Sequence, residues 1–393
     1  MTPDLDATRA GFSRFLGSKP DRLHVAAHSH HPWPDVSFEA QQRAWLDAAE
    51  LIDQKWDRVL GEVIPHALAH VARQLSLPGT DSLAVAPNTH EFLLRLLSCI
   101  ERPVPRILTT DGEFHSFSRQ IARLEEAGRV IVERVPVAPW EDFEDRLAVA
   151  AAAFEGELFY FSQCFFNSGY AIEDLARIVR AVPLAETLVI IDGYHGFMAR
   201  PTDLSAVAGR AFYLAGGYKY AMAGEGCCFL HCPDGHGERP VNTGWYAGFG
   251  ELSARPSGVP YARGGARFLG ATFDPSGWYR FGAVQDWLQA TGWSVPAIHE
   301  HVAALQARLL AALDATAQRA LTSATLLPPP GITRGHFLTF ESDRAADLHQ
   351  RFLAQKVITD YRGDRLRIGL GIYHRDRDID ELAARIEAAL ADE

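Results

Sequence analysis

The stretch from residue 188 to residue 232 constrains the fold of this chain more than any other. It contains three short apolar runs with the composition of buried strands, at residues 188–191, 211–215 and 227–232. Asp192 directly follows the first run, and Lys219 lies just past the end of the second. Ligands of open α/β sheets bind at the carboxyl ends of the strands. We therefore expect an acid and an amine to lie at the binding edge of one sheet.

Two charged groups at a sheet edge need a chemical reason, because burying either of them alone is costly. Pyridoxal phosphate uses both groups. A lysine amine can form a Schiff base with it, and a carboxylate can keep its pyridine nitrogen protonated so that the ring withdraws electrons. The alternative is a solvated loop lysine beside an acid that caps a strand. Because Asp192 and Lys219 both follow strand-like runs, the pair favours the cofactor over that alternative.

The bulk composition limits the class of protein and its partners. A length of 393 residues favours a large and a small lobe, and 47% hydrophobic and 22% charged residues are typical of a globular protein. The net charge of −11 disfavours nucleic acid and anionic membranes as main partners. The chain shows neither an apolar run of membrane-spanning length nor an N-terminal secretion signal. We expect a cytoplasmic protein without a membrane partner.

The five cysteines are odd in number and lie mainly in strand-like runs, which predicts buried, reduced thiols. No Cys-x-x-Cys pair accompanies spaced histidines, so we expect no metal site.

Candidate strands alternate with helical periodicity, which predicts an α/β fold with a mainly parallel sheet between layers of helices. Further candidate strands lie at residues 83–86, 106–110, 130–135 and 158–161. We predict a large domain at 36–284, and a small α+β domain built from 1–35 and 285–393. The apolar spacing of residues 35–75 predicts two helices with a break near Pro65. No Rossmann or P-loop glycine motif occurs, which disfavours dehydrogenases and P-loop enzymes.

Asp192-Gly193-Tyr194-His195, followed by a strand, Tyr218-Lys219-Tyr220 and a Gly-rich turn, resembles a known family. The pattern is similar to fold-type I pyridoxal-phosphate enzymes of the class V aminotransferase family, and most to its kynureninase-like members. The resemblance implies pyridoxal 5′-phosphate as cofactor and Lys219 as the catalytic residue that carries it. It also implies that Asp192 holds the ring nitrogen, and that His195 and Tyr218 line the cofactor site.

Two further segments carry cofactor roles in the family. We predict that Asn88 or Thr89 is the N-cap of a helix that follows strand 83–86. The N-terminus of a helix favours the binding of anions. The resemblance places the cofactor phosphate on both residues. It also places an aromatic ring against the cofactor after strand 106–110. We favour Phe114 for that place, with His115 as its competitor.

Residues near position 250 resemble family segments that reach the cofactor phosphate of a second subunit. Gly244-Trp245 is similar to a kynureninase segment, and Thr272 matches a class V threonine. Trp245 and Thr272 therefore imply a homodimer in which each site needs both chains.

The resemblance also places substrate-binding residues. Arg367 matches the family arginine that holds the substrate carboxylate, whereas Arg365 does not. An arginine suits this role because its planar guanidinium can donate two parallel hydrogen bonds to a carboxylate. His28 and Ser29 occupy a substrate-side segment in which the family has Asn-Ser. Asn167, or alternatively Gln163, lies in a loop beside the cofactor ring.

These expectations predict an enzyme whose small-molecule substrate is an amino acid. The first interpretation is kynureninase-like hydrolytic C–C cleavage or β-lyase chemistry, and the second is transamination to a 2-oxo acid. A catalytically silent binding protein with the same fold is the alternative from another class. A cysteine desulfurase is disfavoured, because that family needs a nucleophilic cysteine in its C-terminal part and none follows Cys232.

Overall fold

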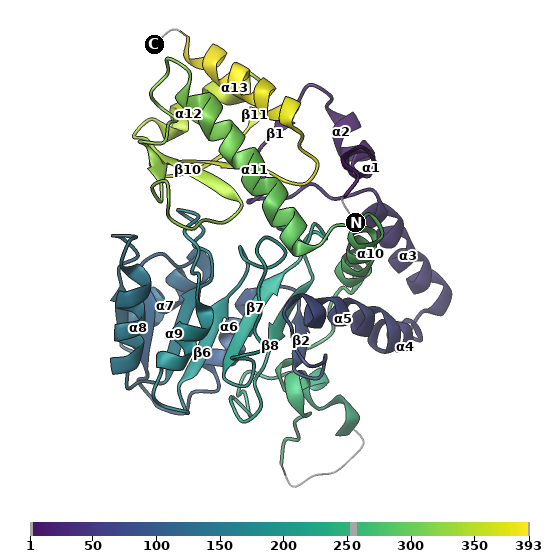
Figure 1. The fold of residues 1–393 in the computed structure, drawn as a ribbon. Coiled ribbons are helices and arrows are strands. Elements are labelled where there is room, and N and C mark those ends of the chain that lie inside the picture. Colours follow the sequence, from purple (N-terminus) through teal and green to yellow (C-terminus); the bar gives the residue numbers. More distant parts are fainter. Residues whose placement is uncertain (1–2, 252–257, 392–393) are drawn as a thin grey trace.

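The structure is a computed structural model that describes residues 3–251 and 258–391. Two lobes are visible in Figure 1, a large one built on a seven-stranded sheet and a smaller one above it. In spatial order the large sheet consists of β2 (Leu83–Ala86), β8 (Cys228–His231), β7 (Ala211–Gly216), β6 (Leu188–Asp192), β5 (Leu158–Ser162), β3 (Arg106–Thr110) and β4 (Ile131–Val135). All seven strands coincide with apolar runs of the sequence.

The large sheet is mainly parallel, as predicted. Strands β7, β6, β5, β3 and β4 run parallel, and β8 and β2 pair antiparallel at one edge. A loop at residues 217–227, with positive φ at Met222, Gly224 and Gly226, leads the chain back from β7 into β8. A short connection of this kind joins antiparallel strands only. In the parallel part, Ser162 lies opposite Asp192 across β5 and β6.

Helices cover both faces of the large sheet. One apolar cluster packs α6 (Thr89–Leu97) and α7 (His115–Glu126) against alternate strand residues such as Ile190 and Leu214. The cluster on the other face holds intervening residues such as Val189 and Tyr213. Its helices are α5 (Ile64–Gln74), α8 (Phe143–Ala153), α9 (Leu175–Ala181) and α10 (Ser276–Ala290). The period of two along each strand therefore separates the two cores.

The smaller lobe has its own core. An antiparallel sheet has the order β12 (Asp360–Arg362), β13 (Arg365–Gly369), β10 (Phe337–Glu341) and β9 (Leu326–Leu327). Its apolar cluster includes residues of α11 (Val295–Asp314), α12 (Ala345–Ala354) and α13 (Asp376–Leu390). The N-terminal segment joins this lobe, because β1 (Leu23–His24) pairs with β11 (Val357–Ile358). The predicted domain boundaries at residues 35 and 284 stay a prediction.

The prediction for residues 35–75 was wrong about where the helices break. Helix α3 (Val36–Leu51) ends at Ile52, whose φ is +53°, and α4 (Lys55–Arg58) runs on through a π-helical turn, η1 (Val59–Val63), into α5. Pro65 lies in the first turn of α5, where the missing N–H costs nothing. The short helices α1 (Leu5–Ala10) and α2 (Ser13–Ser18) were not predicted.

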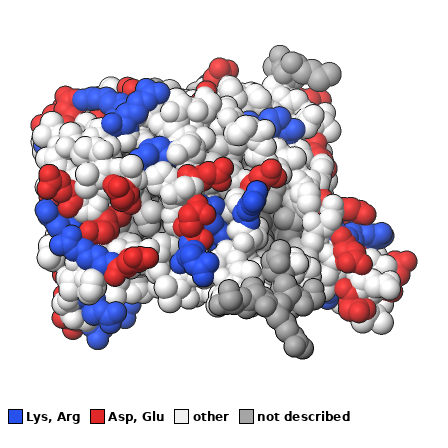
Figure 2. Space-filling view, turned by 90° about the horizontal axis from the view of Figure 1, so that it is seen from below, with Lys and Arg blue, Asp and Glu red and all other residues white. Residues whose placement is uncertain are grey.

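The surface view in Figure 2 shows acidic and basic side chains interspersed among uncharged ones over the face it presents. On that face the negative net charge is not gathered into one acidic patch. Among the described residues, no helix is long and apolar enough to cross a membrane.

Candidate active site

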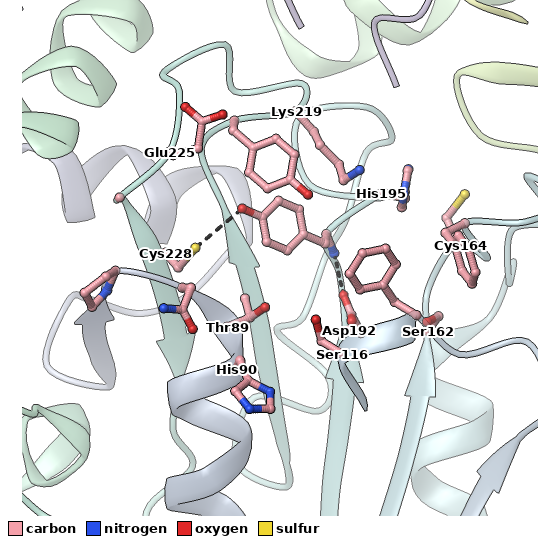
Figure 3. Close-up of a pocket in the computed structure, with 17 residues that line it drawn as sticks. Thr89, His90, Ser116, Ser162, Cys164, Asp192, His195, Lys219, Glu225 and Cys228 are labelled. Carbon is pink, nitrogen blue, oxygen red and sulfur yellow. Dashed lines mark hydrogen bonds between the residues drawn. The ribbon is translucent and has the colours of Figure 1, made fainter. Parts of the chain in front are cut away.

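A cavity of about 310 Å³ lies at the carboxyl ends of β5, β6 and β7. Figure 3 shows side chains from the strand ends and from the first turns of α6 and α7 converging on it. Its lining comprises Pro87, Asn88, Thr89, His90, Phe114, Ser116, Ser162, Cys164, Phe166, Asp192, Tyr194, His195, Tyr218, Lys219, Glu225, Gly226 and Cys228. The predicted acid and amine therefore do meet at one sheet edge.

Lys219 is a buried amine that the fold keeps close to neutral. Its Nζ donates a hydrogen bond to the backbone oxygen of His28, 3.0 Å away, and Figure 3 shows the side chain pointing toward His195. Burial lowers the pKa of Lys219 to about 7, and the Arg367 charge acts in the same direction. The chain has only four lysines, so this buried one is exceptional. An amine with such a pKa can act as nucleophile and base.

Asp192 ends β6 on the floor of the cavity. One carboxylate oxygen accepts the Tyr194 N–H at 2.9 Å, and the other accepts the Tyr160 hydroxyl at 2.7 Å. Burial raises the pKa of Asp192, while these two donors and the Lys219 charge partly offset that rise. Each oxygen retains a lone pair for a further donor. The carboxylate can therefore accept a protonated ring nitrogen.

His195 offers an unused polar atom to a ligand. Its Nδ1 is buried without a hydrogen-bond partner, and burial holds the pKa of the ring well below its usual value. The neutral imidazole packs 5.4 Å from Phe337. An orphaned buried nitrogen at a cavity wall indicates that a bound group completes its hydrogen bonding.

The first turn of α6 forms the end of the cavity predicted to take the phosphate. Asn88 is the N-cap, as one of the two alternatives predicted, and its Oδ1 accepts the Glu91 N–H at 3.0 Å. Thr89 and His90 follow along the cavity wall, and Nδ1 of His90 is buried without a partner. The N–H groups of a first turn have no partner inside the helix, so they suit an anion.

An aromatic wall follows β3. Phe114 lines the cavity, is 37% exposed, and packs edge-on against Phe166 at 5.2 Å. His115 lies outside the lining and contacts Phe166 from another side at 4.9 Å. Of the two competitors, the structure brings Phe114 to the cavity.

Sequence reasoning missed a buried carboxyl behind this wall. Glu113 accepts the hydroxyl of Thr110 at 2.6 Å and lies 2.5 Å from Oγ of Ser162. Burial raises the pKa of Glu113 to about 8. Ser162 itself lines the cavity beside Asp192. The strand end at Ser162 was visible in the sequence, but its pairing with Glu113 depends on the alignment of β3 with β5.

Two predicted cofactor residues lie away from the cavity of their own chain. Trp245 begins the 3-10 helix η2 (Trp245–Glu251), is 44% exposed and stacks on Tyr246 at 4.3 Å. Thr272 is exposed. Since both were predicted to serve the site of a second subunit, their roles stay predictions.

None of the predicted substrate residues His28, Ser29, Asn167 and Arg367 lines the cavity. His28 is fully buried, stacks on Phe337 at 4.6 Å, and holds Lys219 through its backbone oxygen. Ser29 and Asn167 lie outside the cavity lining, and the Asn167 backbone oxygen accepts from Arg365 at 3.3 Å. Gln163, the alternative to Asn167, is engaged elsewhere: it donates to Thr202 and accepts from Tyr213, both at 2.8 Å.

Arg367 is buried, lies outside the cavity lining and is already paired. Its guanidinium donates to Asp360 and to the backbone oxygen of Phe166. Asp360 also accepts from Arg362 at 2.7 Å. The pairing of Arg367 with an internal carboxylate was not predicted.

Among the described residues, one group outside the cavity has the composition of a metal site, formed by His66, His70 and Asp286. Both histidines hydrogen-bond through Nε2 to the Asp286 carboxylate, at 2.9 and 2.8 Å. Arg73 lies on Nδ1 of His70 at 2.5 Å, which places the proton of His70 on Nε2. The group is thus satisfied by its own hydrogen bonds.

The fold and the site define a pyridoxal-phosphate enzyme of fold type I. The family model of "Aminotransferase class-V" matches residues 91–382, and the chain belongs to that family. The cofactor is pyridoxal 5′-phosphate, and the residues fit it: a buried amine, an acid with free lone pairs, an unpartnered histidine nitrogen and a helix N-terminus.

Solved structures agree with this fold. A lysine-to-alanine variant of C-DES, with glycine covalently linked to its PLP cofactor, has a TM-score of 0.82 at 17% identity, covering 98% of this chain and 99% of that one. The apo cysteine desulfurase of Thermococcus onnurineus NA1 has a TM-score of 0.80 at 12% identity, covering 100% and 99%. The cysteine desulfurase CsdA of Escherichia coli has 0.78 at 16%, covering 99% and 98%. No curated protein matches the chain.

Proposed function

We propose that this enzyme acts on an amino acid and cleaves a bond at its β-carbon, by β-lyase elimination or by kynureninase-like hydrolysis. The observation that carries the proposal is that the buried Lys219 amine, whose pKa burial lowers to about 7, and the Asp192 carboxyl line the same cavity. When bound, pyridoxal phosphate supplies an electron sink for negative charge at the substrate α-carbon. The remaining tasks fall to residues of the chain.

Lys219 and Asp192 perform the proton chemistry. Lys219 would hold the cofactor through its amine, and the same amine would serve as the general base for the substrate α-proton. A pKa of about 7 suits that role near neutral pH. Asp192 holds a proton on the pyridine nitrogen, and Tyr160 and the Tyr194 N–H keep its carboxylate oriented.

The remaining cavity residues hold the cofactor in place. Asn88 and Thr89 would hold the phosphate at the N-terminus of α6, and Phe114 would lie against the ring; all three residues line the cavity. His195 donates or accepts through its unpartnered Nδ1, and Tyr218 closes the wall beside Lys219, whose Nζ lies 5.0 Å from the Tyr218 ring.

Arg367 binds the substrate carboxylate, and the N-terminal loop with His28 and Ser29 faces the substrate together with Asn167. Of all charged groups, Arg367 lowers the pKa of Lys219 most, which supports a place for Arg367 near the amine. The exposed Trp245 and Thr272 complete the phosphate site of a second chain, in a homodimer.

The cysteines favour elimination over sulfur transfer to the protein. No cysteine follows Cys232, and burial raises the pKa of both cysteines that line the cavity, Cys164 and Cys228, to about 12. C-DES, a cystine C–S lyase with cysteine persulfide as its reaction product, has the same fold at 17% identity. The kynureninase-like form of the reaction has its own support in the Asp192, Lys219 and Arg367 motifs.

The products identify the reaction. Purified holoenzyme is incubated with cystine, with kynurenine, and with an amino acid plus 2-oxoglutarate. We expect pyruvate from cystine or anthranilate from kynurenine, whereas glutamate alone would show transamination and overturn the proposal. No product from any of the three would favour the silent binding protein.

The lysine is tested separately. Borohydride treatment should fix the cofactor to the chain, and peptide mapping should find it on Lys219 among the four lysines. The Lys219→Ala variant should retain no label, and Lys19→Ala, which changes an exposed lysine, should label as wild type.

A further inference from the structure

The two short strands β12 and β13 place a carboxylate opposite the predicted substrate-binding arginine. In their antiparallel register, Asp360 pairs directly with Arg367. Directly opposed residues of an antiparallel pair point to the same face and lie close enough for their side chains to interact. The contact between Asp360 and Arg367 is therefore built into the hairpin.

Arg367 is held there by one carboxylate oxygen only. One terminal nitrogen donates to Oδ2 of Asp360 and the other to the backbone oxygen of Phe166, while Nε is buried without a partner. The side chain of Arg367 is 4% exposed. A guanidinium has five donors and binds carboxylates best through two parallel bonds, so this pairing leaves capacity unused.

Asp360 has a second cation at hand. Its Oδ1 accepts from Arg362 at 2.7 Å, and Oδ2 lies 3.6 Å from Nε2 of the fully buried His28. Arg362 is about half exposed and Asp360 is 11% exposed. Asp360 can thus leave Arg367 and still keep an ion-pair partner.

We propose that Asp360 occupies, in the empty site, the place of the substrate carboxylate on Arg367, and that the two carboxylates exchange when substrate binds. This inference rests on the proposed function, in which Arg367 binds that carboxylate. Asp360 then stays on Arg362. Asp360 is a positioning residue, because it acts through Arg367 and sets how tightly the site takes an amino acid.

Charge and burial support the exchange. An unpaired cation at Arg367, beside the buried Lys219, would be costly, and Asp360 removes that cost while no ligand is bound. Two arginines and one aspartate leave the group with a net positive charge, so an anion is still attracted. An incoming carboxylate can offer Arg367 two oxygens in place of the one from Asp360.

Propionate tests the exchange without any chemistry, because it carries the carboxylate and no amine. Its dissociation constant is measured by calorimetry on the holoenzyme and on the cofactor-free protein. Asp360→Asn keeps the shape and removes the competing charge, so propionate should bind about tenfold more tightly. The matched control is Asp364→Asn on the same hairpin, whose carboxylate is 62% exposed and should change binding less than about twofold. Unchanged or weaker binding to Asp360→Asn, with the protein folded, would overturn the inference.

A second variant has the opposite sign. Without Arg362, Arg367 is the only cation that donates to Asp360, because the buried His28 ring 3.6 Å away is neutral, so Arg362→Gln should bind propionate more weakly than wild type. Arg365 lies opposite Arg362 on the neighbouring strand. Arg365→Gln removes one positive charge from the same region and therefore controls for the general loss of charge. If the two variants bind propionate equally, Asp360 does not compete. Because Arg362 is half exposed, this comparison remains available where Asp360→Asn fails to fold.

Arg367→Gln separates the inference from the function on which it rests. Loss of propionate binding in this variant, together with unchanged binding to Asp360→Asn, would overturn the exchange alone. Undiminished binding to Arg367→Gln would remove the carboxylate role of Arg367, and with it the exchange. The product assays decide the reaction type in either case.

Discussion

The cavity that fits the cofactor and the arginine cluster proposed to bind the substrate, which lies outside the cavity lining, handle charge in opposite ways. On the large sheet, Lys219 is held near neutrality and His195 is neutral with a free nitrogen. On the small sheet, Arg367, Asp360 and Arg362 are charged and paired with one another. The groups at the large sheet have polar atoms free to bind a ligand, whereas those at the small sheet bind one another.

This difference separates two tasks. Groups that are already in place, with unused lone pairs and N–H groups, need no rearrangement when a cofactor binds. Such preorganised groups are what stabilises charge on a reacting ring. A self-paired cluster must instead break a contact before it binds a substrate. Changes on the cofactor side should therefore reduce kcat or cofactor retention, and changes on the substrate side should alter KM.

The largest effect is expected at Asp192. Asp192→Asn can keep the contacts to Tyr160 and Tyr194 but cannot hold a positive ring nitrogen, so kcat should fall roughly 10²–10⁴-fold with KM little changed. Steady-state kinetics on the folded holoenzyme measure both, with the exposed Asp203→Asn as control. A wild-type kcat would remove Asp192 from the chemistry and contradict the open cofactor side.

The substrate side should respond in KM. Arg367→Gln removes the cation that meets the substrate carboxylate, which corresponds to about 2–5 kcal/mol, or a KM raised roughly 30-fold or more. Arg365, which does not match the family arginine, donates to a backbone oxygen at 3.3 Å and forms a surface ion pair with Asp364 at 3.9 Å. Arg365→Gln should therefore stay within about twofold. A loss confined to kcat in Arg367→Gln would contradict the division of tasks.

The comparison also explains what the sequence could predict. The cofactor side was predictable, because Asp192 and Lys219 each follow a buried strand and parallel strands bring their carboxyl ends to one edge. The N-cap at Asn88 was recognisable for a similar reason, since its signal is local.

The substrate side was predictable only in part. Arg367 carried a family motif, but its partner Asp360 depends on the register of β12 against β13, which no local periodicity fixes. The Glu113–Ser162 pair was missed for the same reason, because it joins the loop after β3 to the end of β5, which are far apart in sequence. Pro65 misled the helix prediction, since a proline in a first turn does not break a helix.

The third prediction measures the cost of the near-neutral lysine. Its pKa falls from the ordinary 10.5 to about 7, so between these values the unfolded chain binds more protons and stability rises with pH. Lys219→Met should therefore stabilise the cofactor-free protein by on the order of 3 kcal/mol at pH 7, and by less at pH 9. Urea unfolding at both pH values gives the difference, with the exposed Lys19→Met as control. A gain that does not depend on pH would mean that Lys219 is protonated in the fold.

The smallest effect should distinguish the two aromatic candidates on the cofactor side. Phe114 lines the cavity and His115 does not, so Phe114→Ala should weaken cofactor binding by about 0.5–1.5 kcal/mol, up to roughly tenfold in the dissociation constant. His115→Ala should change it less than about twofold, because its ring contacts Phe166 from outside the lining. Equilibrium dialysis against pyridoxal phosphate measures both constants. A larger loss in His115→Ala would mean that α7 turns His115 toward the ring when the cofactor binds, and the cofactor side would then have to rearrange as the substrate side does.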